Sequence, residues 1–299
     1  MQIFLEILNN SYHNILFILF FFVLGAILGS FFNVVVFRYP KMMDHDAAHE
    51  IKSWLEEKKL KIPEGIEKYE ENINLNFPSS HCYNCHKSLK WYHNIPLLSY
   101  LFLKGKCGYC GVKISLQYPI VEFFAGLLLA FSYYYFTPIL GFIGFSIISF
   151  YLLVTYLLLM IDFKTMYLPD SFNYLLLWFG IFIDAIYQPL FQLKLKEAIL
   201  AVVIGYLILW IFAKMGKLLK GIDAMGDGDL KLVAAMGAFI GLKGVVFTIF
   251  ASPIIGIITW IYFKVKGQKE PHFPFGPALI LTSWIYLMFG SNILHYLGL

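Results

Sequence analysis

The sequence has 299 residues, of which 59% are hydrophobic and only 14% are charged, and its mean hydropathy is +0.69. This composition is typical of a polytopic membrane protein and excludes an ordinary soluble domain. The formal net charge of +4 is too small and too dispersed to indicate a nucleic-acid-binding protein, and no basic stripe with interleaved aromatic residues occurs.

The N-terminal sequence favours a first helix that is retained in the protein. Met1-Gln-Ile-Phe-Leu-Glu has no basic region, and no small-residue cleavage site follows the first apolar run. Because a secretory signal peptide shows both features, we expect this run to be a membrane helix and not a signal peptide.

Eight apolar runs are long enough to be membrane helices, since a hydrocarbon core of ~30 Å takes ~20 residues to cross. Short Gly/Pro punctuation, such as Thr137-Pro138 and 241–244, separates several of them. The sequence therefore predicts an all-α polytopic membrane protein with about eight transmembrane helices. The runs lie at about 14–38, 118–137, 139–161, 171–190, 196–213, 228–247, 248–265 and 274–294.

The distribution of lysine predicts the face of the membrane that each loop occupies. Cytoplasmic loops are enriched in Lys and Arg, and eight crossings place three lysine-rich loops on the same side. We therefore expect these loops to face the cytoplasm and both termini to lie outside. The lysines are Lys214, Lys217 and Lys220 in one loop, Lys264, Lys266 and Lys269 in another, and Lys87, Lys90, Lys104, Lys106 and Lys113 in the loop after the first helix.

That large loop, residues 39–117, is the only sizeable soluble part. Its first half, 41–76, holds six Lys and nine Asp/Glu and has a helical pattern around 54–60, whereas 81–117 has five Lys and no acid. We expect a first transmembrane helix at 1–38, a cytoplasmic domain at 39–117 that begins with a charged insertion, and a seven-helix membrane domain at 118–299.

The four cysteines form two Cys-x-x-Cys pairs, Cys82/Cys85 and Cys107/Cys110, separated by 21 residues. Each pair can present two sulfurs to one ion, which predicts a tetrahedral zinc site with a structural role. The alternatives are four free cytosolic thiols or, if the topology is inverted, two disulfides. His81 and His86 are further candidate ligands, although four cysteines already complete a closed site.

Two aspartates lie where predicted helices meet the cytoplasmic face. Asp162 ends the third helix, and Asp229 begins the sixth within a polar, glycine-punctuated stretch. Two carboxylates that share a site cannot both ionise easily, so one can activate water while the other donates a proton to a scissile carbonyl. The alternative is that each aspartate only caps a helix.

Other acidic residues have competing explanations. Asp170 begins the predicted helix at 171–190, where we expect it to act as an N-cap. Glu122 lies inside an apolar run and either pairs with a nearby lysine or takes part in a second activity. The side chains of Asp227 and Asp223 face either solvent or the candidate site. Neither GxSxG, HExxH nor a Walker A motif occurs, so other chemistries lack support.

Taken together, these motifs resemble the bifunctional type IV prepilin peptidases, which combine a leader peptidase of the GxGD intramembrane aspartic protease group with an N-methyltransferase. The likeness covers nearly the whole chain. It rests on Gly-Ser-Phe-Phe-Asn-Val-Val-Val-Phe-Arg-Tyr-Pro at 29–40, the cysteine segment through 126 with Trp-Tyr-His-Asn-Ile-Pro-Leu-Leu-Ser at 91–99 and Tyr-Pro-Ile-Val-Glu at 118–122, Ile-Asp-Phe at 161–163, Leu-Pro-Asp at 168–170, Gly-Asp-Gly-Asp-Leu-Lys-Leu at 226–232, and Phe-Pro-Phe-Gly-Pro at 273–277.

The resemblance implies that Asp162 and Asp229 are the catalytic pair in a bacterial inner membrane and that the four cysteines bind zinc. It implies prepilin or pseudopilin substrates, cleaved on the cytoplasmic side after a basic leader, and methylation of the new N-terminus from S-adenosylmethionine. The supporting residues around Asp229 are Gly226, Gly228 and Lys231. By position alone, the candidates for the methyl-donor site are Gly105, Lys104, Lys106 and Glu122.

The sequence departs from the family pattern in two places and leaves two other functions open. The insertion at 41–76 is longer and more acidic than expected, and we hypothesise that its acidic residues attract a basic leader. Asp223 stands where the family more often has Glu.

Methyl transfer rests on the resemblance alone, so a peptidase without methyltransferase activity is one alternative. A non-enzymatic zinc-knuckle membrane protein is the other. Membrane lipid is an expected partner of the basic segment 81–117, and nucleic acid is not.

Overall fold

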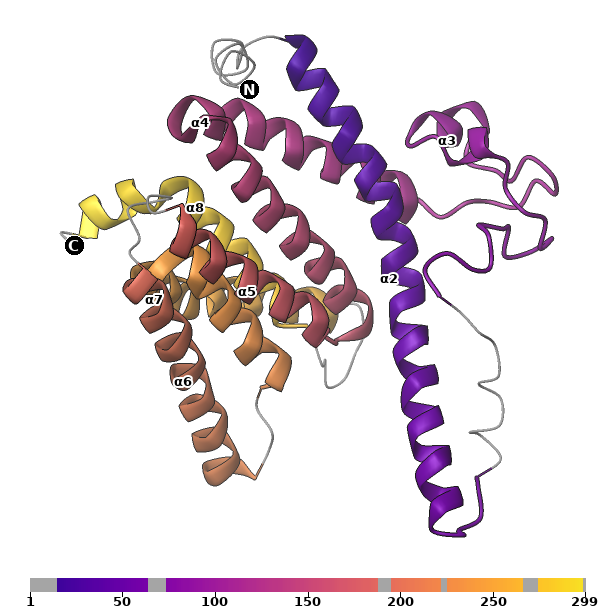
Figure 1. The fold of residues 1–299 in the computed structure, drawn as a ribbon. Coiled ribbons are helices and arrows are strands. Elements are labelled where there is room, and N and C mark those ends of the chain that lie inside the picture. The colour runs from indigo at the N-terminus through magenta and orange to yellow at the C-terminus, as the bar shows by residue number, and fades with distance from the viewer. Residues whose placement is uncertain (1–14, 64–73, 188–194, 222–224, 266–273, 298–299) are drawn as a thin grey trace. The chain divides into compact units, whose positions relative to one another are not determined.

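The computed structural model describes residues 15–63, 74–187, 195–221, 225–265 and 274–297, and the regular structure within these ranges is helical apart from two isolated β-bridges (Figure 1). The all-α prediction is confirmed. The predicted sites or loops at Asp223, Lys266 and Lys269 lie outside the described residues. The chain forms two compact units, residues 1–139 and 140–299.

Four helices have the length and composition to cross a membrane: α2 (Ile15–Glu57), α4 (Gln117–Thr165), α6 (Leu195–Lys220) and α7 (Asp227–Val265). The backbone of α4 is not helical at Gly141 (φ 69°, ψ −178°), and that of α7 is not helical at Gly241 (φ 66°, ψ −178°). Glycine reaches such positive φ values without steric cost. The interruption in α7 falls within the punctuation predicted at 241–244, although the two apolar runs were divided between 247 and 248, because this glycine and not the end of an apolar run breaks the helix.

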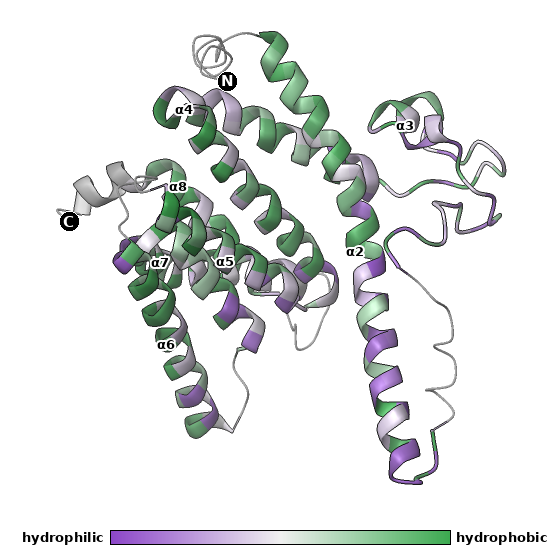
Figure 2. Cartoon of the chain, in the orientation of Figure 1, coloured by the Kyte–Doolittle hydropathy of each residue, from purple (hydrophilic) through white to green (hydrophobic). Residues whose placement is uncertain are grey.

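The first helix is much longer than its apolar run. The apolar run was predicted to end at residue 38, but α2 continues through Pro40 as one helix of 43 residues. Figure 2 shows that α2 changes from hydrophobic to hydrophilic along its length. Hydropathy marks where lipid contact ends, whereas the helix persists because its polar half is rich in good helix formers such as Ala, Glu and Lys.

Close backbone packing joins α2 to the first part of α4 within residues 1–139. A Cβ atom built on Gly25 would lie 2.5 Å from the carbonyl oxygen of Ala125, and one built on Gly29 would lie 2.8 Å from Cα of Glu122. This Gly-x-x-x-Gly spacing is the pattern that lets membrane helices approach closely. The Asn33 amide donates to the Tyr118 carbonyl at 3.1 Å and fixes the two helices near the start of α4.

In residues 140–299, α7 is the central helix and packs against α5 (Asp170–Ile186), α6 and α8 (Gly276–Leu297). Close contact with α5 requires glycine, since a Cβ on Gly180 would lie 2.6 Å from Cβ of Ala238. The second part of α4 is tied to α8 by the hydroxyls of Tyr151 and Ser283, 2.7 Å apart. This packing fixes the last turn of α4 and the first turns of α7 and α8, which hold the candidate site.

Candidate functional site

Asp162 and Asp229 lie near one another in residues 140–299. Asp162 is in the last turn of α4 and only 4% exposed, whereas Asp229 is the third residue of α7 and is partly buried. The Asp162 carboxylate lies close enough to Asp229 for its charge to be felt there. The structure thus brings together two acids that are far apart in the sequence.

Backbone N–H groups at two helix starts face the two carboxylates. The N–H of Gly276, the first residue of α8, faces Asp162, and the N–H of Gly226, just before α7, faces Asp229. Helix N-termini favour negative charge because their N–H groups have no partner within the helix. Asp162 Oδ2 is buried without a hydrogen-bond partner among the described residues, which leaves an acceptor for a water molecule or a proton.

Two glycines allow the starts of α7 and α8 to pack closely against Asp162 and Leu168. A Cβ atom on Gly276 would lie 2.6 Å from Oδ2 of Asp162 and 3.2 Å from Cδ1 of Leu168. A Cβ atom on Gly228 would lie 2.9 Å from Cβ of Leu168. Gly226 is less confined, since its nearest neighbour would be Oδ2 of Asp229 at 3.7 Å. The sequence analysis named Gly276 only as part of a short motif and did not predict its close approach to Asp162.

A bidentate ion pair clamps the first turns of α5 and α7 together. Lys231 Nζ donates to Oδ1 and Oδ2 of Asp170, both at 2.7 Å, and lies 5.9 Å from the centre of the Tyr174 ring. The prediction that Asp170 is an N-cap is wrong: Pro169 occupies that position, and no side chain caps the helix. The carboxylate is used instead to hold Lys231, two residues after Asp229.

The sequence analysis missed Asn173, which lies one turn after Asp170. Its side chain is buried, and neither amide atom has a hydrogen-bond partner among the described residues. Asn173 lies on the same buried stripe of α5 as Gly180, which contacts α7. A polar residue on the buried stripe of an apolar helix was the available signal.

Asp227, by contrast, is the first residue of α7 and is exposed.

The four cysteines converge in residues 1–139. All four sulfur atoms lie within 4.8 Å of one another, and those of Cys82 and Cys110 are 3.7 Å apart. Zn–S bonds of ~2.3 Å in a tetrahedron place sulfurs ~3.8 Å apart, so the spacing fits a zinc ion with little movement. His81 and His86 are exposed and do not belong to this cluster of described residues.

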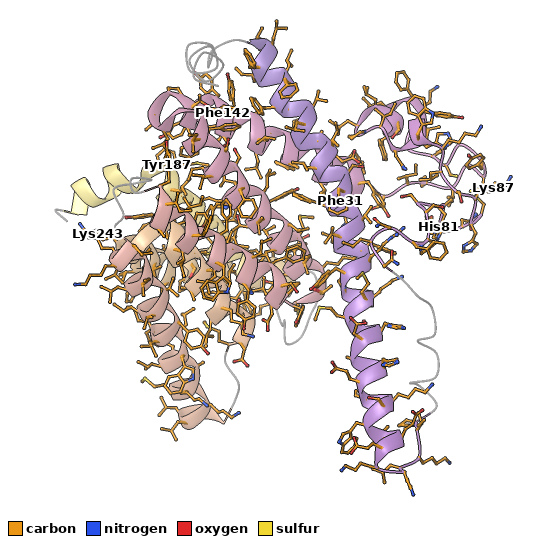
Figure 3. All side chains as sticks on the ribbon, in the orientation of Figure 1. Phe31, His81, Lys87, Phe142, Tyr187 and Lys243 are labelled. Atoms are coloured by element: carbon orange, nitrogen blue, oxygen red, sulfur yellow. The ribbon has the colours of Figure 1, made fainter. Side chains whose placement is uncertain are left out.

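The two Cys-x-x-Cys turns have the same backbone pattern. The N–H of Cys82 donates to the carbonyl of Lys87, and that of Cys107 donates to the carbonyl of Val112. The residue after each second cysteine has a positive φ, 52° at His86 and 72° at Gly111. Each turn is closed by an isolated bridge, and each therefore presents its two sulfurs in the same way. Figure 3 labels His81 and Lys87, which flank the first turn.

Hydrogen bonds to sulfur prepare the cluster for a cation. The backbone N–H groups of Cys85 and Asn84 lower the pKa of Cys82, and the N–H of Val112 lowers that of Cys110 to about 6. For Cys85, the N–H of Lys87 acts in the same direction, but desolvation and the adjacent sulfurs outweigh it and raise the pKa to about 11. Four thiolates repel one another, and a divalent metal ion relieves that repulsion.

The candidate methyl-donor residues lie around helix α3 (Leu98–Phe102). The Glu122 carboxylate accepts the backbone N–H of Leu97 at 2.8 Å and a hydrogen bond from Ser30, so pairing with lysine, one of the two alternatives for this residue, is not seen among the described residues. Leu97 has φ 60°, a strained value for a bulky residue that costs of order 1–3 kcal/mol. Gly105 is buried and has φ 67°, and a Cβ there would lie 2.8 Å from the Tyr100 hydroxyl.

Lys104 and Lys106 flank Gly105, and both are exposed. Their ammonium groups are therefore free to meet an anionic group of a ligand, whereas Glu122 is buried beside Leu97. The structure places these four residues in one segment of residues 1–139, apart in sequence from the aspartate pair.

Comparison with known proteins gives two family matches, one in each compact unit. A family described as the bacterial peptidase A24 N-terminal domain matches residues 23–136, and the type IV leader peptidase family matches residues 147–261. The first range contains the cysteine cluster, and the second contains Asp162 and Asp229. No solved structure matches the chain significantly.

Curated relatives match nearly the full length. A prepilin leader peptidase/N-methyltransferase of Neisseria gonorrhoeae is 37% identical over 278 residues, which cover 91% of this chain and 90% of that protein. The protein of the same name from Stutzerimonas stutzeri is 37% identical and covers 93% and 92%. That of Xanthomonas campestris pv. campestris is 35% identical and covers 90% of each chain.

Proposed function

Because the chain belongs to the type IV leader peptidase family, we propose that it cleaves the leader from type IV prepilins or pseudopilins and methylates the new N-terminal residue. Relatives named for both activities support this proposal. The observation that carries the peptidase half is the approach of the Asp162 and Asp229 carboxylates at the ends of two helices.

In the proposed reaction, one carboxylate takes a proton from water as the water oxygen attacks the scissile carbonyl carbon. The other carboxyl group, protonated, donates to the carbonyl oxygen. When the tetrahedral intermediate collapses, the C–N bond breaks, the amine takes the proton that the first carboxyl group received from water, and the second carboxylate recovers a proton from the gem-diol hydroxyl. Gly226 leaves room for the substrate backbone, Gly228 lets Leu168 pack directly against the start of α7, and Lys231 supports the turn that holds Asp229.

We place this chemistry at the cytoplasmic boundary of the bacterial inner membrane, with both termini outside. The first helix at 1–38 leads into a cytoplasmic domain at 39–117, and 118–299 forms a seven-helix peptidase domain. The distribution of lysine supports this orientation. The interruptions at Gly141 and Gly241 divide two of the four long helices, as about eight crossings require.

The cysteine cluster would hold a structural zinc ion through Cys82, Cys85, Cys107 and Cys110. Four thiolate ligands leave no open coordination position for substrate water, so we assign the metal no part in the reaction. Its effect is to join the two Cys-x-x-Cys turns into one small domain.

S-adenosylmethionine, when bound, would supply the methyl group. Gly105, Lys104, Lys106 and Glu122 are the proposed binding residues: the opposite charges of the two lysines and Glu122 match the carboxylate and the cationic groups of this molecule, and Gly105 lies between the lysines. The exposed ammonium groups of the two lysines suit the carboxylate. Glu122 suits a cation, although its carboxylate already accepts one backbone N–H.

The test is co-expression with a candidate prepilin, followed by mass spectrometry of the prepilin N-terminus. We expect cleavage and one added methyl group with the wild-type chain and no cleavage with Asp162→Asn or Asp229→Asn. Asp227→Asn is the matched control, since this exposed acid lies in the same turn as Asp229 and should keep cleavage. Retained cleavage by a folded Asp162 or Asp229 variant would refute the pairing.

The same spectrum separates the alternatives. A peptidase without methyltransferase activity would give a cleaved N-terminus that lacks the methyl group. A non-enzymatic zinc-knuckle membrane protein would leave the prepilin uncleaved with every variant and with the wild-type chain.

A further inference from the structure

Four large apolar side chains are presented to the surface by α3 and by the short helix η2 (Trp91–Asn94) that precedes it. Trp91 is 78% exposed, Leu98 51%, Leu101 68% and Phe102 82%. Figure 2 shows α3 as an apolar turn within a largely polar segment. Such a cluster on a small domain is unfavourable in water and indicates a surface that something covers.

A hydrogen bond fixes the height of this cluster along α4. The N–H of Leu97 donates to Glu122, which lies five residues after the first residue of α4, or about 8 Å along the helix axis. Leu98, the first residue of α3, follows immediately. Helix α3 therefore begins level with the second turn of α4 and not in the loops beyond it.

At the same height, α4 itself presents apolar side chains outward. Ile120, Phe123 and Phe124 are exposed on its first two turns. If α4 crosses the membrane, as proposed above, these side chains meet lipid. The apolar side chains of α3 then lie at the depth where lipid headgroups give way to acyl chains.

The charged residues of the segment that carries α3 have a single sign. Lys90 precedes η2, Lys104 and Lys106 follow α3, and residues 81–117 contain five lysines and no acid. All three named lysines are exposed. An aromatic and aliphatic cluster edged by lysine matches the boundary of an anionic bilayer, where Trp sits among the headgroups and Lys reaches the lipid phosphates.

We propose that η2 and α3 form an interfacial anchor. Trp91, Leu98, Leu101 and Phe102 enter the headgroup boundary of the cytoplasmic leaflet, and the flanking lysines bind anionic headgroups. Elements of this kind bury their apolar face ~5–10 Å into the boundary, which agrees with the height set by Glu122. An apolar protein segment would also cover these four side chains, but the exposed lysines of a segment that contains no acid, with Glu122 buried, favour lipid.

The test places the photoreactive residue p-benzoylphenylalanine at Phe102 in the full-length protein. The protein is reconstituted in phosphatidylcholine vesicles with and without phosphatidylglycerol, illuminated, and analysed by mass spectrometry for lipid and peptide adducts. The same probe at exposed Phe123 of α4 is the lipid-facing control, and the probe at exposed Trp54 of the polar half of α2 is the water-facing control.

We expect lipid adducts at 102 and 123, each roughly tenfold above the yield at 54. In mixed vesicles, phosphatidylglycerol adducts at 102 should exceed their share of the lipid by roughly fivefold, and Lys90→Gln combined with Lys104→Gln should remove this preference. Lipid adducts at 123 but not at 102, or adducts at 102 with residues 140–299 or with added prepilin, would overturn the anchor alone. Absence of lipid adducts at both positions would overturn the crossing of α4 as well.

Discussion

Substitution of Gly276 by alanine tests how closely the catalytic proposal depends on the position of Asp162. The new Cβ would lie 2.6 Å from Oδ2 and 3.2 Å from Cγ of that carboxylate. Ordinary C···O contacts are no shorter than ~3.3 Å, so the carboxylate must move by about 0.7 Å. Since a misplacement of ~1 Å can cost ~100-fold in rate, we expect kcat for leader cleavage to fall roughly 10-fold to 100-fold.

Cleavage of a purified prepilin by the enzyme in lipid nanodiscs would give kcat and KM separately. Because the displaced group is proposed to act in the chemical step, KM should change little. Gly226→Ala is the matched control: its Cβ would meet only Oδ2 of Asp229, at an ordinary 3.7 Å. It should leave kcat within about threefold, and any effect should appear in KM, because Gly226 is proposed to make room for the substrate.

Loss of packing at Leu168 is the competing cause, since the Gly276→Ala Cβ would also lie 3.2 Å from its Cδ1. The double variant Gly276→Ala/Leu168→Ala removes that contact and keeps the one with Asp162. The reasoning is refuted if the double variant regains wild-type kcat, or if Gly276→Ala alone keeps full activity with an unchanged melting temperature.

Three further experiments test other parts of the structure. Lys231→Met and Asp170→Asn should each lower kcat, but their effects should not add, because both break the same ion pair. We expect a coupling energy of ~1 kcal/mol, about fivefold in kcat, in the double variant. Additive losses would contradict a role for this ion pair. Cys110→Ser should lower bound zinc, measured by elemental analysis, well below about one ion per chain, and full retention would exclude the four-cysteine site. Gly29→Ala should lower the melting temperature, since its Cβ would lie 2.8 Å from Cα of Glu122 and backbone cannot yield cheaply; an unchanged value would contradict the close packing.

The cysteine cluster was predictable because its geometry is local. Each Cys-x-x-Cys turn closes through hydrogen bonds within six residues, so the spacing of the sequence already fixes two sulfurs per turn. The approach of Asp162 to Asp229 was predictable in a different way. An even count of crossings places the end of one predicted helix and the start of another on the same membrane face, and glycines near Asp229 permit close packing.

The partners of individual side chains could not be read from the sequence. Asp170 was expected to cap its own helix, but it binds Lys231, which is 61 residues away in the chain. Glu122 binds the backbone N–H of Leu97, a residue whose positive φ the sequence does not indicate. These choices depend on how helices pack, and neither residue type nor spacing contains that information.

The length of helix α2 affects how the leader of a substrate can bind to it. A helix of 43 residues is about 65 Å long, roughly twice the thickness of a hydrocarbon core. The part from residue 39 to 57 therefore extends about 28 Å beyond the predicted end of the apolar run. An extended peptide gains ~3.4 Å per residue, so a leader starting at the membrane surface needs about eight residues to reach the far end of α2. The reach of a leader, as well as its charge, then decides which acidic residues of α2 it can touch.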